Sequence, residues 1–84
     1  MEIKIYRMAK VVKESNVKAF IDVIIDNDLI VKGFRLVEGK EGMFLANPSE
    51  KGTDNKYFDT ARFANDETKK TVEKLAIEKF KAKE

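Results

Sequence analysis

The stretch VKAFIDVIIDNDLIVKGFRLV, residues 17–37, decides the fold of this 84-residue chain. Residues 17–26 alternate between two side-chain rows and are rich in β-branched residues, which predicts a strand. Asp26-Asn27-Asp28 predicts a tight turn, because Asn and Asp tolerate left-handed backbone geometry. Residues 29–37 predict the returning strand. The stretch therefore predicts a β-hairpin within an antiparallel sheet.

Both faces of this hairpin carry apolar side chains. Phe20 and Ile24 fall opposite the main apolar row of the first strand. One helix cannot cover both faces of a sheet, so we expect an exposed apolar face in a monomer, of the kind that marks an interface. Strict alternation places Val17, Ala19, Ile21, Val23 and Ile25 on one face of the first strand. In the second strand it places Ile30, Lys32, Phe34 and Leu36 together on one face.

Flanking segments extend the sheet. Residues 2–8 predict a strand with Ile3, Ile5 and Arg7 on one face. Gly39-Lys40-Glu41-Gly42 matches the letters of the GXXG loop of KH domains, but that loop joins two helices, whereas this one joins two strand patterns and predicts a turn. Residues 43–46 predict a short strand, which Pro48 ends because proline cannot donate to a ladder.

The C-terminal part predicts a loop and a helix. The composition of residues 47–56 indicates an irregular exposed loop, and Tyr57 begins a short strand that reaches Phe63. Asn65 or Asp66 is expected to cap a helix over 66–82. The apolar stripe that packs this helix on the sheet consists of Val72, Leu75, Ala76 and Phe80, with Ile77 at its edge.

The whole pattern predicts an α+β fold, an antiparallel sheet of four to five strands with a C-terminal α-helix, in a single small domain over 1–84. Hydrophobic residues make up 43% and charged residues 38% of the chain, which indicates a folded domain with a highly charged surface. The chain has no cysteine, which fits a reducing compartment. We expect a cytoplasmic protein without a membrane span.

The residue inventory argues against catalysis. There is no histidine to act as a general base or zinc ligand, and nothing to activate Ser15 or Ser49 as a nucleophile. We therefore expect no enzyme activity, catalytic residue, cofactor, metal or small-molecule substrate. The aromatic residues Phe44, Tyr57, Phe58 and Phe63 are expected in the core rather than as base-stacking groups.

The lysine-rich C-terminal helix is the feature with a functional interpretation. Residues 69–83 contain six lysines, including Lys83, and two acids. Lys69, Lys70 and Lys74 on an exposed helix face could contact phosphates. The alternative is a solvated helix face, since lysine is a common surface helix former.

Residues 29–49, LIVKGFRLVEGKEGMFLANPS, resemble the central signature of the stage V sporulation protein G (SpoVG) family. The glycines, Arg35, Phe44, Ala46 and the pair Pro48-Ser49 fall in register with it. The resemblance extends back to Met1 and forward through the aromatic-x-Asp element at residues 57–59 to the helix. Its most specific part is residues 33–49.

This resemblance implies a DNA- and RNA-binding regulator of gene expression, linked to sporulation and septation, that acts as a homodimer without a cofactor. It implies nucleic-acid contacts in the loop after Pro-Ser and in the helix. The family commonly has two basic residues after Pro-Ser, whereas this chain has Glu50-Lys51. The expected contact residues are Lys51, Lys56, Lys69, Lys70 and Lys74.

A rival hypothesis is a protein–protein interaction module that regulates septation without touching nucleic acid. In that case the lysine helix is only solvated. A continuous basic strip shared by two protomers would favour nucleic acid.

Overall fold

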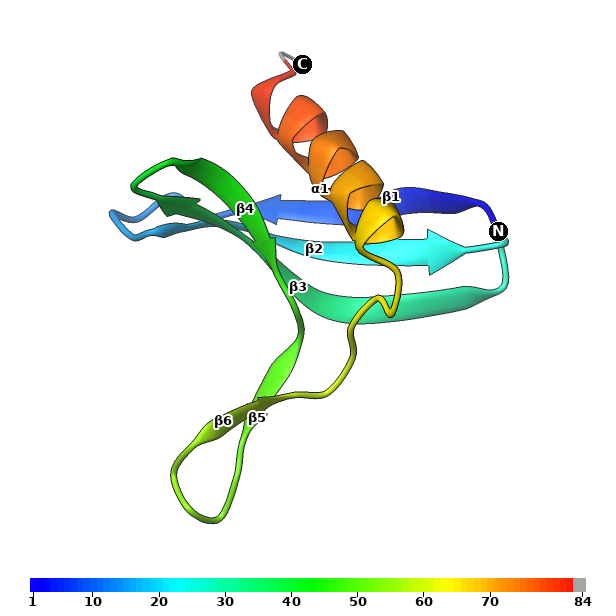
Figure 1. Ribbon diagram of the computed structural model, residues 1–84. Coiled ribbons are helices and arrows are strands. Elements are labelled where there is room, and N and C mark those ends of the chain that lie inside the picture. The colour runs from blue at the N-terminus through cyan, green and yellow to red at the C-terminus, as the bar shows by residue number, and fades with distance from the viewer. Residues whose placement is uncertain (83–84) are drawn as a thin grey trace.

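The computed structural model describes residues 1–82, which form two small sheets and one helix (Figure 1). Four strands make an antiparallel sheet in the order β1-β2-β3-β4, and two short strands make a separate sheet, β5-β6. The predicted α+β fold is confirmed. The elements are β1 Ile3–Lys10, β2 Val17–Ile25, β3 Leu29–Gly39, β4 Gly42–Ala46, β5 Ser49–Lys51, β6 Tyr57–Asp59 and α1 Asp66–Lys81.

Two tight turns connect the central strands. Asp26 and Asn27 have φ angles of 53° and 57°, and the Asp28 amide donates a hydrogen bond of 2.9 Å to the Ile25 carbonyl. Positive φ at both central positions matches the right-handed twist of the strands, as in hairpin turns of this kind. Gly39 pairs with Gly42 across the β3–β4 turn. Both predicted turns are confirmed.

The core lies between one face of the four-stranded sheet and α1. The cap of α1 is Asn65, whose Oδ1 accepts hydrogen bonds of 2.8 and 3.3 Å from the Glu67 and Thr68 amides. The predicted cap is therefore confirmed.

The buried apolar residues of the core come from three strands and the helix, namely Ala19, Ile21, Val23, Phe34, Leu36, Leu45, Val72 and Ala76. No helix within residues 1–82 is long and apolar enough to cross a membrane.

Bulges shift the faces that strict alternation predicts. The pairing of β2 with β3 shifts between Ile21 and Val23, opposite Gly33, which has a φ angle of 96°. The extra residue reverses the alternation, so Val31 packs against the core while Ile30 is exposed. A second shift, between Ile5 and Arg7 in β1, places Met8 rather than Arg7 against the core.

Three other predictions are corrected at the C-terminal side. Leu75 is exposed, because Val72 and Ala76 already fill the space between α1 and the sheet, while Ile77 packs against the core. The segment 47–56 contains β5, because its backbone pairs with β6. The strand predicted to reach Phe63 ends at Asp59.

Candidate nucleic-acid interface

Three lysines form a basic stripe on the solvent side of α1. At 3.6 residues per turn, Lys70, Lys74 and Lys81 lie within about 40° of one another around the helix. All three are exposed, and the buried Val72 and Ala76 lie on the opposite side. Glu67 and Glu78 are exposed on the same helix side, within about 40° of Lys74, and reduce the local positive charge. We call Lys70, Lys74 and Lys81 the α1 stripe.

Lys69 does not share this exposed side. It lies near the helix side that carries Val72 and Ala76, and it is half-buried. The prediction that it lies beside Lys70 and Lys74 on one exposed face is therefore wrong. Lys81 takes its place in the stripe, and the seven-residue spacing from Lys74 could have indicated this from the sequence. Lys83 lies outside the described residues.

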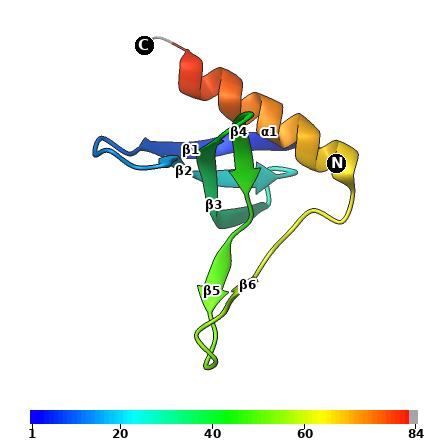
Figure 2. The same cartoon turned by 60° about the vertical axis from the view of Figure 1, so that its left-hand side comes forward.

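Lys51 and Lys56 lie apart from the helix, on the hairpin formed by β5, β6 and the turn between them. We call residues 49–59 the arm. Figures 1 and 2 show that the arm projects from the body on the side away from α1. Both lysines are exposed. The structure thus separates the five predicted contact residues into an arm group and a helix group.

Hydrogen bonds from the sheet fix the base of the arm. Arg35 Nη2 of β3 donates to the Asn47 carbonyl at 3.2 Å and to Ser49 Oγ at 3.4 Å. On the returning strand, the Thr60 amide donates to the Pro48 carbonyl at 2.8 Å, and Asn47 Nδ2 donates to Asp59 Oδ2 at 3.1 Å. These bonds set the direction in which the arm leaves the sheet.

Aromatic side chains on the arm and on the sheet are exposed, contrary to prediction. The exposed fractions are 73% for Tyr57, 52% for Phe58 and 44% for Phe44. The arm carries the first two beyond the reach of the core, and Phe44 lies on the sheet face that α1 does not cover. Phe63 alone of the four packs against the core, with its ring centroid 5.5 Å from that of Phe34.

The sheet face opposite α1 is open and carries exposed apolar side chains beside Asp22 and Arg35. Its central residue is Phe20, which is 50% exposed and pairs with Arg35 of β3. Ile24 pairs with Ile30 near one end of β3, and Val37 pairs with Phe44 near the other. We call these residues the open face, which comprises Phe20, Ile24, Ile30, Val37 and Phe44.

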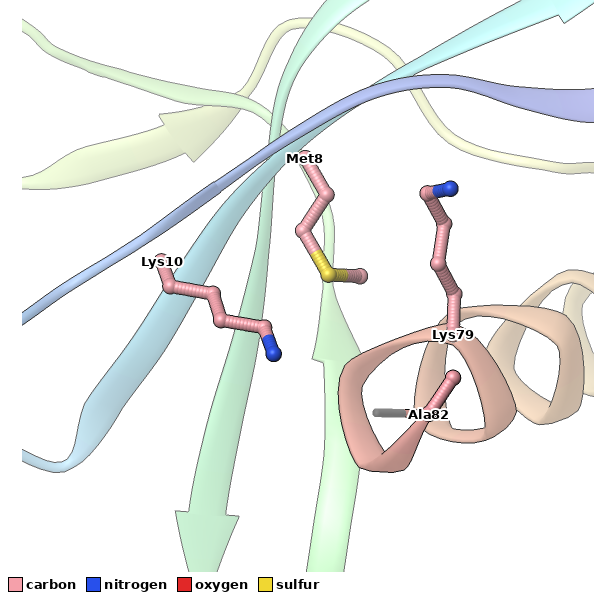
Figure 3. A pocket seen from close by; sticks show the side chains of 4 residues that line it. All are labelled: Met8, Lys10, Lys79 and Ala82. Atoms are coloured by element: carbon pink, nitrogen blue, oxygen red, sulfur yellow. The ribbon is translucent and has the colours of Figure 1, made fainter. Parts of the chain in front are cut away.

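A cavity of about 340 Å³ lies between β1 and the end of α1, lined by Met8, Lys10, Lys79 and Ala82. In Figure 3, Met8 lies between the two lysine side chains. Lys10 Nζ is also 5.2 Å from the centroid of the Phe80 ring, a cation–π distance. Lys10 and Lys79 complement the partial negative charge of the helix C-terminus. We therefore assign these lysines to stabilisation of the helix end and propose no ligand for the cavity.

The described residues define a small α+β protein with a basic helix surface, a projecting hairpin and an open apolar sheet face. The SpoVG family model matches residues 1–82, and the chain belongs to the SpoVG family. The resemblance carried by residues 29–49 is thereby confirmed.

Three relatives show how much of the chain this similarity covers. An Agathobacter rectalis protein named "Putative septation protein SpoVG" is 36% identical over 81 residues, 96% of this chain and 93% of its own. Proteins of the same name from Caldicellulosiruptor bescii and Lachnospira eligens are 35% and 32% identical. They are matched over 98% and 100% of this chain and 93% and 96% of their own lengths.

Proposed function

We propose that this protein is a homodimeric DNA- or RNA-binding regulator linked to septation and sporulation, which acts in the cytoplasm and is not an enzyme. The observation that carries the proposal is the α1 stripe, three exposed lysines on one side of a helix. Lysine side chains in such a row can contact successive phosphates and release their counterions. The names of the relatives support the link to septation.

The five residues predicted from the sequence keep different roles in this proposal. Lys70 and Lys74 contact phosphates as members of the α1 stripe, together with Lys81. Lys51 and Lys56 contact the polyanion from the arm. Lys69 contributes charge from the edge of the interface, because its side chain is half-buried.

The surface area of the isolated chain supports a dimer. A compact monomer of 9.6 kDa exposes about 5,100 Å², whereas this chain exposes 6505 Å². The projecting arm contributes to this excess of about 1,400 Å², which also leaves room for the roughly 800 Å² that each partner buries in a standard interface. The open face supplies apolar residues for such a contact. In a two-fold dimer the open face of one copy packs against the open face of the other. The dimer also doubles the lysines offered to one polyanion.

Binding of labelled DNA and RNA, measured by gel shift at two salt concentrations, tests the proposal. We expect retardation of the probes at low salt and markedly weaker binding at high salt, because phosphate contacts release counterions. A protein that binds neither polymer at low salt would contradict it.

The open face also favours the second candidate function, a protein–protein interaction module that regulates septation. Large exposed apolar patches mark protein contacts. The two functions differ in what the α1 stripe does. In the module, neutralising the stripe leaves partner binding unchanged, whereas in the regulator it weakens nucleic-acid binding.

A further inference from the structure

The arm carries a second kind of chemistry that its lysines alone do not explain. Cross-strand pairing places Glu50 opposite Phe58, and Lys51 opposite Tyr57. Residues directly opposite in an antiparallel pair share a face of the ribbon. One face of the arm therefore combines the most exposed aromatic ring of the pair with a lysine, and the other combines Phe58 with an acid.

The two aromatic rings differ in their surroundings. The Phe58 ring folds back over the hairpin and lies next to Gly52. A side-chain Cβ atom at position 52 would be in van der Waals contact with Phe58 Cε1, at 3.4 Å. Tyr57 keeps 73% of its surface in solvent. Its ring is thus free to receive a flat partner, while the backbone that carries it is directed by the Arg35 bonds at the base of the arm.

The acids of the arm are largely engaged within it. Asp54 Oδ1 accepts from the Lys56 amide at 3.1 Å, which shapes the turn. Asp59 shares the Tyr57 face, but it lies at the end nearest the body and accepts from Asn47 Nδ2. Lys51 is then the charged residue directly opposite Tyr57 in the ribbon.

We propose that Tyr57 stacks on an unpaired base while Lys51 contacts an adjacent phosphate, so that the arm selects single-stranded DNA or RNA over duplex. This inference rests on the proposed nucleic-acid binding and names the form of nucleic acid preferred. An aromatic ring beside a cation suits single strands, because every base has a face for stacking and the backbone supplies phosphates. In a duplex the base faces are already stacked on each other.

The experiment compares fluorescence anisotropy of a labelled random-sequence 20-mer, single-stranded and as a duplex, for four proteins. These are the wild type, Tyr57→Ala, Tyr57→Phe and the opposite-face control Phe58→Ala. We expect Tyr57→Ala to weaken single-strand binding by about 5- to 150-fold, the size of one stacking contact, and to change duplex binding less than about two-fold. Tyr57→Phe and Phe58→Ala should keep the wild-type preference.

A second readout isolates the ring itself. The chain has two tyrosines and no tryptophan, so stacking on Tyr57 should quench tyrosine fluorescence when a single strand is added. Tyr57→Phe should bind as tightly as the wild type and lose that quenching.

Several results would overturn the inference. Equal losses for both probes in Tyr57→Ala would make Tyr57 a general contact, and a fall of that variant to monomer mass in sedimentation would make it a subunit contact. A wild type that binds only duplex refutes the stacking role and leaves the proposed function standing. A wild type that binds neither probe refutes both.

Discussion

Glu73 of α1 accepts a hydrogen bond of 2.8 Å at its Oε2 atom from the backbone amide of Leu45. β4 is an edge strand of the four-stranded sheet, since it pairs only with β3 among the described residues. Edge amides invite pairing with other chains, and natural proteins cover them. Glu73 therefore closes part of this edge and ties the helix to it, a structural role for an acid within the lysine-rich segment.

Replacing Glu73 by Ala should lower the free energy of unfolding by about 1.5–3 kcal/mol, the range for a hydrogen bond to a charged group. Urea denaturation followed by circular dichroism measures the change. Glu78→Ala is the matched control, because Glu78 is exposed on the same helix, and it should change stability by less than about 0.5 kcal/mol. Equal effects of the two substitutions would show that the Leu45 bond contributes nothing.

Neutralising the α1 stripe should weaken nucleic-acid binding without unfolding the protein. In the triple variant Lys70→Gln, Lys74→Gln, Lys81→Gln, the slope of log affinity against log salt should fall by about 2–3. Anisotropy titrations at four salt concentrations give this slope. The single variant Lys74→Gln should lower the slope by about 1, and its matched control Lys40→Gln, on the β3–β4 turn, should leave the slope unchanged. An unchanged slope in a folded triple variant would leave the stripe as a solvated surface.

Glu50→Lys should strengthen binding at low salt, because it restores a basic pair with Lys51 and removes a repulsion of about 1 kcal/mol from a neighbouring phosphate. The gain should shrink as salt screens the charge. Glu50→Gln separates the loss of the negative charge from the gain of the positive one, and it should give roughly half the effect. If Glu50→Lys binds no better than the wild type at low salt, the arm is not a contact surface.

Local patterns predicted the sheet well because its turns and its core row are encoded by short-range chemistry. Asp26 and Asn27 adopt the left-handed geometry that their side chains tolerate. The row Ala19, Ile21, Val23 alternates without interruption and is fully buried. The helix was predicted for the same reason, since its cap and its apolar spacing are both local signals.

The missed features depend on contacts that alternation cannot show. Gly33 lies in a bulge, which reverses the side-chain rows along β3, and a single glycine gives only a weak signal of it. The sequence predicts a loop over residues 47–56 because β5 is only three residues long and, among the described residues, pairs with β6 alone. Hydrophobicity predicts Tyr57 and Phe58 in the core, whereas the arm carries them away from it.

The same distinction applies to the candidate site. Composition predicts the positive charge in the C-terminal helix. The helical spacing also groups Lys81 with Lys70 and Lys74, a signal that the prediction does not use. The same geometry places Lys69 about 20° around the helix from Ala76, on the side that faces the core, and this accounts for its half-burial.

The open face should hold two copies together, and charging its centre should separate them. Phe20→Lys removes an apolar contact worth about 1.5–3 kcal/mol when buried and faces each copy with an unpaired ammonium. In a two-fold interface the change occurs twice, so we expect dimer dissociation to rise by at least about 100-fold. Sedimentation equilibrium at micromolar concentration should then give a mass near 9.6 kDa for the variant and twice that for the wild type.

The matched control for this prediction is Leu75→Lys, because Leu75 is an exposed apolar residue on α1, away from the open face. It should leave the dimer intact. Phe20 is not part of the buried core, so the circular dichroism spectrum of Phe20→Lys should match that of the wild type, and a lost dimer then reports the interface rather than unfolding. A wild-type mass near 9.6 kDa would refute the dimer, and the nucleic-acid proposal would then have only one set of lysines on which to depend.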